Sequence, residues 1–171
     1  MKSPNERFES WWRGENEGLP LMYVVAVDEN APPVPRPETP EAFWTDADYL
    51  IARARAGISG RRYLADAYPS VSADLGPGSL ALYLGSEPRF AWDTVWYEKC
   101  IDDLENHPPL AFDPENRWWR RHFQLVKEIR DALKGECLVD MPDIIENLDI
   151  YAALRGTENA LYDLMDDPDL V

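Results

Sequence analysis

The segment that constrains this fold most is residues 137–171, at the C-terminal end of the sequence. A short apolar run follows a helix stop at Gly135, and a loop rich in carboxylates then leads into a helix that ends at an Asp-Asp-Pro boundary. This order is typical of one strand–loop–helix step in a parallel α/β structure. Because the rest of such a sheet is missing, we expect the chain to be a fragment of a longer α/β protein.

The composition favours a globular domain and excludes several classes of function. With 171 residues, of which 45% are hydrophobic and 12% aromatic, the chain can form one domain with a substantial core. Its formal net charge of −15 argues against nucleic acid as a partner, because the phosphate backbone would be repelled. No apolar run reaches the ~20 residues of a membrane span, and no secretion signal opens the sequence, so we expect a cytoplasmic protein without membrane contact.

Cysteine and histidine are too scarce for a metal site within this chain. Cys100 and Cys137 form no CxxC motif, and only His107 and His122 accompany them. A structural zinc site takes four such ligands and would need every Cys and His of this chain, so we predict no metal here. His122 lies beside the apolar stripe of a helix predicted over residues 113–135, and we interpret it as a packed residue without a catalytic role.

Three segments have the composition of strands. Residues 19–27 form a continuous apolar run that predicts a strand buried on both faces, and residues 62–66 and 136–141 predict two shorter strands. Residues 28–40 carry prolines at positions 32, 33, 35, 37 and 40, which predict a long ordered loop or flap. Helical spacing resumes over residues 41–56.

Two further segments admit more than one interpretation. Gly76 and Gly78 precede a short helix, but their spacing matches neither a dinucleotide-binding loop nor a Walker loop, so we favour a sharp turn. Residues 90–98 are rich in aromatic and β-branched side chains and predict an extended segment. Within it, Trp92 and Trp96 either stack on a ligand or only pack against their neighbours.

Polar side chains gather where the third predicted strand ends. In parallel α/β folds, the residues at the carboxyl ends of the strands carry the chemistry. The candidate substrate-binding residues in this region are Asp140, Asp143, Glu146, Asn147 and Asp149.

Several short motifs occur along the chain in a distinctive order. An N-terminal helix carries Arg7, a Leu-Pro pair at residues 19–20 opens the first strand, and Asp66 ends the second strand shortly before a proline. A helix then closes with Leu-Gly at residues 84–85, and a polar turn precedes Ala-Leu-Arg-Gly at residues 153–156. In this layout the chain resembles the uroporphyrinogen decarboxylase superfamily, which includes the decarboxylase itself and related methyltransferases that act on corrinoid proteins and thiols.

The resemblance implies an α/β fold, a (β/α)8 barrel about twice as long as this chain, whose N-terminal half would supply three parallel barrel strands and their helices. It also implies that Asp66 is catalytic: an aspartate there would hold the pyrrole nitrogens of a tetrapyrrole and stabilise positive charge while carbon dioxide leaves. Tyr68, Trp92 and Trp96 would then be walls of the substrate pocket. The alternative for Asp66 is a turn-forming residue before Pro69.

Two departures from the family's pattern bear on the substrate. The decarboxylases carry an arginine-rich stretch after their first strand that pairs with the substrate's carboxylates, whereas this chain has Arg36 alone. Burying carboxylates without cations is costly, so a porphyrinogen would be poorly held. The family's Gly-Gly-Pro turn is replaced by Met-Pro-Asp at residues 141–143. Zinc ligands of the methyltransferase branch come from the second half of the barrel, so zinc stays possible in a full-length protein.

Two functions therefore stand as alternatives. In the first, the chain is the N-terminal part of a uroporphyrinogen decarboxylase-like enzyme, a decarboxylase or a methyltransferase, and is inactive alone. In the second, it is a non-catalytic module that stacks a sugar or an aromatic ligand on exposed Trp and Tyr side chains. The bare strand edges along residues 19–27 and 137–141 predict association with a second copy or with the missing half.

Overall fold

The computed structural model describes residues 3–15, 18, 20–28, 33–144, 147–166 and 168–169. The helices are α1 (Pro4–Trp12), α2 (Pro40–Thr45), α3 (Ala47–Ser59), α4 (Ser79–Tyr83), α5 (Arg117–Ala132), α6 (Asn147–Arg155) and α7 (Thr157–Asp166). The strands are β1 (Tyr23–Val27), β2 (Arg61–Ala65), β3 (Ser70–Val71), β4 (Glu87–Phe90), β5 (Val95–Glu98) and β6 (Leu138–Val139).

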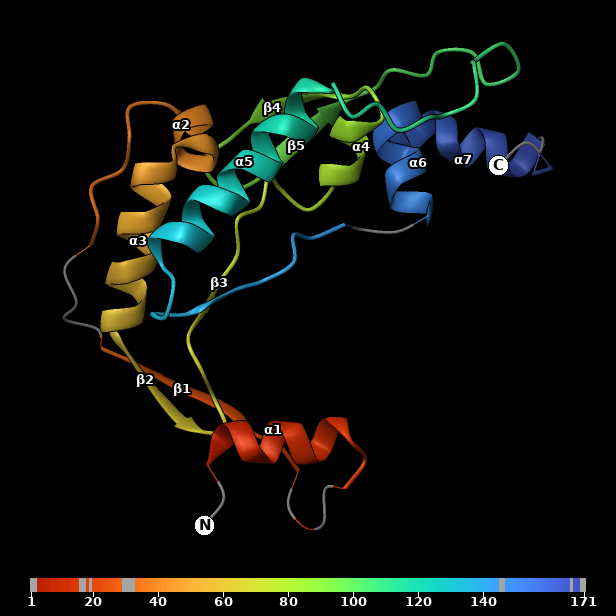
Figure 1. Cartoon of the computed structure of the whole chain (residues 1–171). Coiled ribbons are helices and arrows are strands. Elements are labelled where there is room, and N and C mark those ends of the chain that lie inside the picture. Colours follow the sequence, from red (N-terminus) through yellow and green to blue (C-terminus); the bar gives the residue numbers. More distant parts are fainter. Residues whose placement is uncertain are drawn as a thin grey trace.

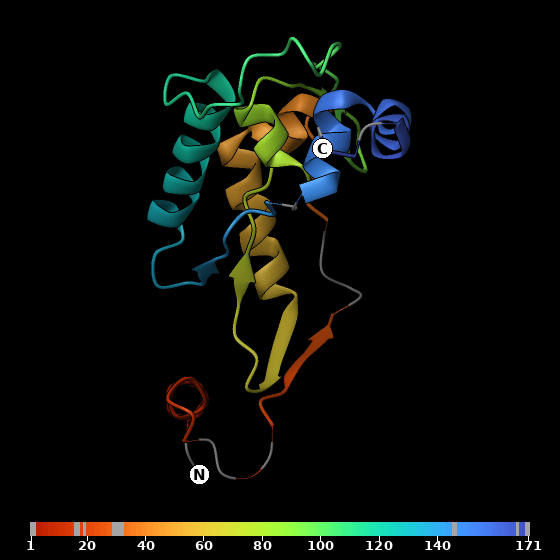
Figure 2. The ribbon, with the colours of Figure 1, turned by 90° about the vertical axis from the view of Figure 1, so that its right-hand side faces the viewer.

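These elements form a body and an arm (Figure 1). The body contains α2 to α7 together with the β4–β5 hairpin, and the arm consists of the ribbon β1–β2 with α1 at its far end. The same separation is visible after a quarter turn (Figure 2). Except where the ribbon meets α3, the arm thus lies away from the body's core.

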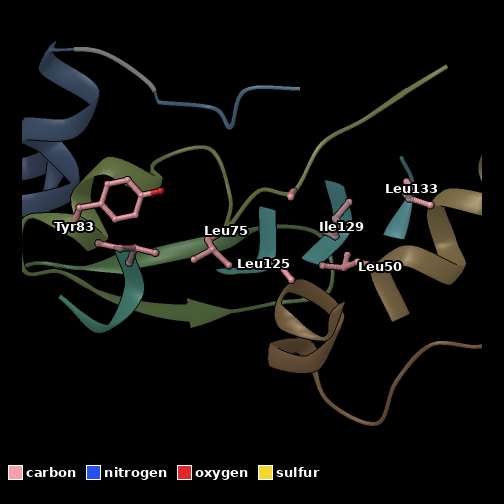
Figure 3. Packing of buried hydrophobic residues seen from close by; sticks show 8 residues of the cluster. Leu50, Leu75, Tyr83, Leu125, Ile129 and Leu133 are labelled. Atoms are coloured by element: carbon pink, nitrogen blue, oxygen red, sulfur yellow. The ribbon is translucent and has the colours of Figure 1, made fainter. Parts of the chain in front are cut away.

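The core of the body forms where α3 and α5 pack together (Figure 3). Leu50 comes from α3, Leu125 and Ile129 come from α5, and Leu75 reaches them from the segment between β3 and α4. All four side chains are buried. Since complete burial of such a side chain contributes about 1.5–3 kcal/mol, this cluster accounts for much of the stability of the body.

Helix caps explain where the sequence expectations for helices were off by a few residues. Asp46 caps α3 by accepting a hydrogen bond from the backbone of Tyr49 at 2.9 Å, so the single helix expected over residues 41–56 is divided into α2 and α3. Asn116 caps α5 in the same way, and the helix therefore begins after the expected start at Asp113. At the N-terminus, Ser3 and Glu6 form a capping box.

The strand directions correct part of the expected fold. β1 and β2 pair antiparallel, with Val25 opposite Tyr63, whereas parallel strands were expected here, and that expectation was wrong. The reason is the course of α3, which returns the chain to the end of β1, where the Asp28 N–H donates to the Gly60 carbonyl at 2.8 Å. β3 and β6 do pair in parallel. Whether the chain is half of a (β/α)8 barrel stays a prediction.

The ribbon also differs from expectation in its burial. Residues 19–27 were expected to form a strand buried on both faces, yet Tyr23 is 56% exposed and Val27 is 66% exposed. Leu19 and residues 29–32 lie outside the described residues. Among the residues that the structure describes, no helix has the length and apolar character needed to cross a membrane.

The Gly-Pro-Gly segment before α4 forms a close contact with Tyr97 of β5. Gly76 has a φ of 85°, and a Cβ atom on it would lie 2.6 Å from the Tyr97 hydroxyl oxygen. The Gly78 N–H donates to the same hydroxyl at 2.7 Å, and the hydroxyl donates to the Leu75 carbonyl at 3.1 Å. The two glycines therefore serve a tight turn packed against a tyrosine, which supports the interpretation as a turn.

Candidate functional site

Asp66 lies at the end of β2 and joins α1 to the ribbon. Its side chain is 5% exposed, and its carboxylate forms a 2.7 Å salt bridge with the Arg7 guanidinium. The other carboxylate oxygen accepts the Met22 N–H at 3.0 Å, and the Asp66 N–H donates to the Met22 carbonyl at the same distance. These contacts show a structural role for Asp66, while the catalytic role stays a prediction.

Tyr68, two residues further on, packs within the arm. Its ring makes T-shaped contacts with Phe8 and Tyr23, with centroids 5.4 Å and 5.8 Å apart. The Tyr23 hydroxyl donates to the Tyr68 carbonyl at 2.9 Å. Tyr68 also lines a hollow of about 620 Å³ between α1 and the start of β6, which makes it the one predicted site residue on that hollow among those described.

The acidic residues after β6 lie at the carboxyl end of the parallel pair β3–β6. The Asp140 N–H donates to the Val71 carbonyl at 2.8 Å, and the Asp143 N–H donates to the Asp74 carboxylate at 2.8 Å. Asp74 comes from the loop after β3 and was not among the predicted residues. Asn147 and Asp149 are exposed at the start of α6, and Glu146 lies outside the described residues.

The predicted site residues do not converge on one pocket. Within the described residues, no hydrogen bond, ion pair or ring contact joins Asp66 to residues 140–144 or 147–149. Trp96 is 58% exposed on β5. Trp92 stands beside α2, where its ring makes a T-shaped contact with Phe43 at 5.9 Å.

Near Trp92, three arginines line one cleft of about 430 Å³. Arg36 comes from the proline-rich segment, Arg53 from α3 and Arg61 from the first position of β2. The residues that line it, hereafter the arginine cleft, are Val27, Asp28, Pro33, Val34, Arg36, Phe43, Tyr49, Arg53, Ala56, Gly57, Gly60 and Arg61.

Aromatic rings hold two of these guanidinium groups. The Arg53 guanidinium carbon lies 4.8 Å from the Phe43 ring centroid and 5.5 Å from that of Tyr49. The Arg36 guanidinium carbon lies 5.8 Å from the centroids of both Phe43 and Trp92. Such cation–π contacts orient a guanidinium group but leave its N–H donors available.

The arginines of the cleft lack carboxylate partners within the described part of the chain. Ten other basic residues form salt bridges there: Arg7, Arg13, Arg55, Arg89, Lys99, Arg117, Arg120, Arg121, Arg130 and Arg155. Arg62, Lys127 and Lys134 also form no salt bridge within the described residues, so the lack of one is not peculiar to the cleft. What distinguishes Arg36, Arg53 and Arg61 is that all three line one cleft, in which Asp28 is the acidic residue.

A second hollow, of about 390 Å³, adjoins the arginine cleft. Arg53, Gly57 and Arg61 line both spaces, and the second one extends to Ser72 and Asp74 after β3. Asp74 accepts a hydrogen bond from the Ser72 hydroxyl as well as from the Asp143 N–H. Arg53 and Arg61 thus line both the arginine cleft and the hollow that reaches Asp74.

A buried hydrogen-bond chain runs from the Ala73 carbonyl, next to Asp74, through His122 of α5 to Tyr83 of α4. His122 is 1% exposed, its Nε2 bonds to the Ala73 carbonyl and its Nδ1 lies 2.6 Å from the Tyr83 hydroxyl. Because a carbonyl only accepts, Nε2 carries the proton and the Tyr83 hydroxyl donates to Nδ1. Burial lowers the pKa of His122 and raises that of Tyr83, so both stay neutral. This agrees with a packed histidine.

Little in the sequence predicts the arginine cleft. Arg53 and Arg55 stand in one helical tail, yet α3 directs Arg55 to Glu136 at 2.8 Å and Arg53 to the aromatic rings.

Among the described residues, no group of three or more His, Cys, Asp or Glu side chains is arranged to hold a metal ion. No protein-family model, curated protein or solved structure matches the chain.

Proposed function

We propose that the chain is part of a uroporphyrinogen decarboxylase-like enzyme and that the arginine cleft binds carboxylate groups of a tetrapyrrole- or corrinoid-related substrate. The observation that carries the proposal is the convergence of Arg36, Arg53 and Arg61, without carboxylate partners among the described residues, on an aromatic-lined cleft. From the sequence, Arg36 alone was expected to pair with the substrate's carboxylates, whereas the cleft adds Arg53 and Arg61. The enzyme would act in the cytoplasm, without nucleic-acid or membrane partners.

The chemistry of the cleft supports a ligand that is both anionic and flat. A guanidinium group presents a planar set of N–H donors that matches a carboxylate in a two-point contact. The rings of Phe43, Tyr49 and Trp92 lie beside these donors and offer faces or edges to a flat ring system. A volume of about 430 Å³ falls within the range of small-molecule sites.

The negative net charge of the chain opposes the binding of an anionic ligand. At −15 the chain repels an anion at long range, but charges further than about 8 Å are largely screened at physiological ionic strength. The local cations then decide whether the anion binds. We expect affinity to depend on all three arginines and to fall as salt is added.

Catalysis on this proposal still requires groups beyond the cleft. A decarboxylase must stabilise the protonated, positively charged pyrrole that accepts the electron pair of the C–C bond as carbon dioxide leaves, which is the role predicted for Asp66. Here the Asp66 carboxylate is engaged by Arg7 and by the Met22 N–H, so it would have to exchange these contacts for pyrrole N–H groups. We therefore expect binding without turnover in the isolated chain, and zinc for a methyltransferase branch stays a prediction.

The test is binding of uroporphyrin, followed by its absorbance and fluorescence, to the chain and two variants. Arg53→Gln should weaken binding at least ~10-fold, the loss expected for one charge-assisted contact. Arg62→Gln is the matched control, because Arg62 lies next to Arg61 on β2 but does not line the cleft. Equal affinity for all three proteins would contradict the proposal.

The non-catalytic alternative keeps one specific observation in its favour, the 58% exposure of Trp96. A module that stacks a sugar or an aromatic ligand on this ring would bind uncharged ligands and would lose affinity in Trp96→Ala. The carboxylate site would not respond to that change, because Trp96 does not line the arginine cleft.

Coproporphyrin, which has fewer carboxylates than uroporphyrin, should bind more weakly only if the arginines determine affinity.

A further inference from the structure

The Arg61 side chain lies against α3 at Gly57, a position where this helix has no side chain. A Cβ atom added to Gly57 would lie 3.2 Å from Nη1 and 3.9 Å from Cζ of Arg61. The first distance is shorter than ordinary van der Waals contact, which is about 3.5–4.0 Å. The guanidinium group therefore occupies space that any larger residue at position 57 would take.

The backbone of α3 gives no reason for a glycine at this position. Gly57 lies inside the helix and is not one of the glycines with positive φ. Alanine is the most favourable residue in a helix interior, and glycine is one of the least favourable. The helix has alanine at positions 47, 52, 54 and 56, so the glycine at 57 is a departure that the contact with Arg61 explains.

The backbone of Arg61 is fixed, so its side chain would have to yield to a larger residue at position 57. Arg61 is the first residue of β2, where it pairs with Val27, and it follows directly on Gly60. The Gly60 N–H donates to the Ala56 carbonyl at 3.0 Å, and the Gly60 carbonyl accepts the Asp28 N–H at 2.8 Å. These bonds hold the turn between α3 and β2 (Figure 1), whereas the guanidinium group ends a flexible side chain.

Arg53 and Gly57 share one face of α3, because they are four residues apart. Arg53, Gly57 and Arg61 all line both the arginine cleft and the adjoining hollow of about 390 Å³. One helical turn rises about 5.4 Å, so the contact with Gly57 places the Arg61 guanidinium one turn beyond the point where Arg53 leaves the helix. One helix face thus presents two cations to the same cleft.

We propose that Gly57 is a positioning residue of the arginine cleft. The absence of a side chain at position 57 lets the Arg61 guanidinium lie on α3, where Arg61 and Arg53 bind carboxylates of the same ligand. A ligand with two carboxylate arms on one ring, such as uroporphyrin, would engage both cations. This inference rests on the proposed function and adds the reason why the helix keeps a glycine there.

Uroporphyrin binding to Gly57→Ala tests the positioning role. The added Cβ atom displaces the Arg61 guanidinium, and we expect the affinity to fall at least ~3-fold, which is part of the loss of a whole charge-assisted contact. The melting temperature should rise at the same time, because alanine favours the helix. Unchanged affinity, or a lower melting temperature, would overturn the inference, since the guanidinium would then not be displaced by the new methyl group.

Ala52→Gly is the matched control. Position 52 lies on the same helix but lines neither the arginine cleft nor the adjoining hollow. Its melting temperature should fall, because glycine disfavours the helix, while its affinity for uroporphyrin stays unchanged. A parallel fall of affinity in Ala52→Gly would show that binding follows helix stability rather than the position of Arg61, and would reject the role of Gly57.

A double-mutant cycle shows whether Gly57 acts through Arg61. Arg61→Gln should weaken uroporphyrin binding at least ~10-fold. In that background no guanidinium group remains at position 61 to be displaced, so Gly57→Ala should cause no further loss of affinity. A further loss of the same size as in the unmodified chain would show that Gly57 acts independently of Arg61, which contradicts the inference.

A measurement without ligand separates this inference from the proposed function. The Arg61 Nε–H signal in NMR spectra should shift in Gly57→Ala and stay in place in Ala52→Gly. If the unmodified chain and Arg53→Gln bind uroporphyrin equally, the proposed function fails and the positioning role fails with it. If Arg53→Gln and Arg61→Gln weaken binding, while Gly57→Ala neither shifts the Arg61 signal nor weakens binding, only the positioning role fails.

Discussion

Arg7 and Asp66, from α1 and from the end of β2, form a 2.7 Å salt bridge in which the Asp66 side chain is 5% exposed and that of Arg7 is 30% exposed. Because α1 lies outside the core of the body, this salt bridge is one of the contacts that hold α1 against the β1–β2 ribbon (Figure 1). Ala65, just before Asp66, has a φ of 57°, a conformation that turns the chain sharply into this contact.

Replacing Asp66 should therefore loosen the arm as well as affect any chemistry. Asp66→Asn removes the carboxylate that lies 2.7 Å from the Arg7 guanidinium, and we expect the free energy of unfolding to fall by about 1–3 kcal/mol. Urea denaturation followed by tryptophan fluorescence measures the change. Arg13→Gln, which removes an exposed ion pair with Glu9 and Glu15, is the control and should have little effect. An equally stable Asp66→Asn protein would contradict the structural role.

The turn against Tyr97 makes a separate prediction about two glycines with positive φ. Gly76→Ala places a Cβ atom 2.6 Å from the Tyr97 hydroxyl oxygen and the Val95 Cβ, whereas Gly135→Ala meets no atom within 4 Å. Both changes incur the strain of a left-handed conformation, about 1 kcal/mol, and only Gly76→Ala adds a clash. We expect Gly76→Ala to lower the unfolding free energy by at least ~2 kcal/mol more than Gly135→Ala. Equal losses would show that the turn can relax.

The local elements of this fold followed from the sequence, whereas its long-range contacts did not. The apolar runs and caps located α5, β1 and β2 to within four residues, because these signals are local. The one helix expected before the Asp-Asp-Pro boundary is instead divided into α6 and α7, and the extended segment expected over residues 90–98 belongs to the β4–β5 hairpin. Pairing direction depends on where a connection returns the chain, and no residue within β1 encodes the path of α3. The arginine cleft escaped prediction for the same reason, since Arg36 and Arg61 lie far apart in the sequence.

For the candidate site residues too, local signals in the sequence indicated position along the chain but not the long-range contacts. Asp140 and Asp143 follow β6, whose parallel partner β3 was not among the strands expected from the sequence. The prediction for Asp66 rests on a resemblance to a family pattern, and its partner Arg7 depends on how α1 folds back, which that pattern does not describe. His122 is buried on the same face of α5 as Leu125 and Ile129, whereas Phe123, one position further on, is 62% exposed, so the covered face differs from the apolar stripe expected from the sequence.

His122 should make the stability of the protein depend on pH below neutrality. Burial lowers its pKa in the folded state below the ordinary value of 6.5, so the unfolded chain binds the extra proton first. Stability is then fully present above pH 6.5 and decreases as the pH falls below that value. Unfolding free energies between pH 5.5 and 8 should show this slope, and His122→Gln should reduce it. His107→Gln is the control, and an unchanged slope in His122→Gln would refute the assignment.

Tyr97 predicts the opposite behaviour in alkali. Burial raises its pKa from 10.0 to about 12, so the unfolded chain releases the phenolic proton before the folded one does. Stability should therefore decrease as the pH rises from 10 to about 12, and tyrosinate absorbance at 295 nm should show a late-titrating group until the protein unfolds. Tyr97→Phe removes this contribution, together with the hydrogen bonds to Gly78 and Leu75, so it should be less stable at pH 8 but lose less stability between pH 8 and 11. Tyr162→Phe, at a 54% exposed position, serves as the control and should keep the slope of the unmodified chain. If Tyr97→Phe keeps that slope too, the hydroxyl is not held neutral by the turn.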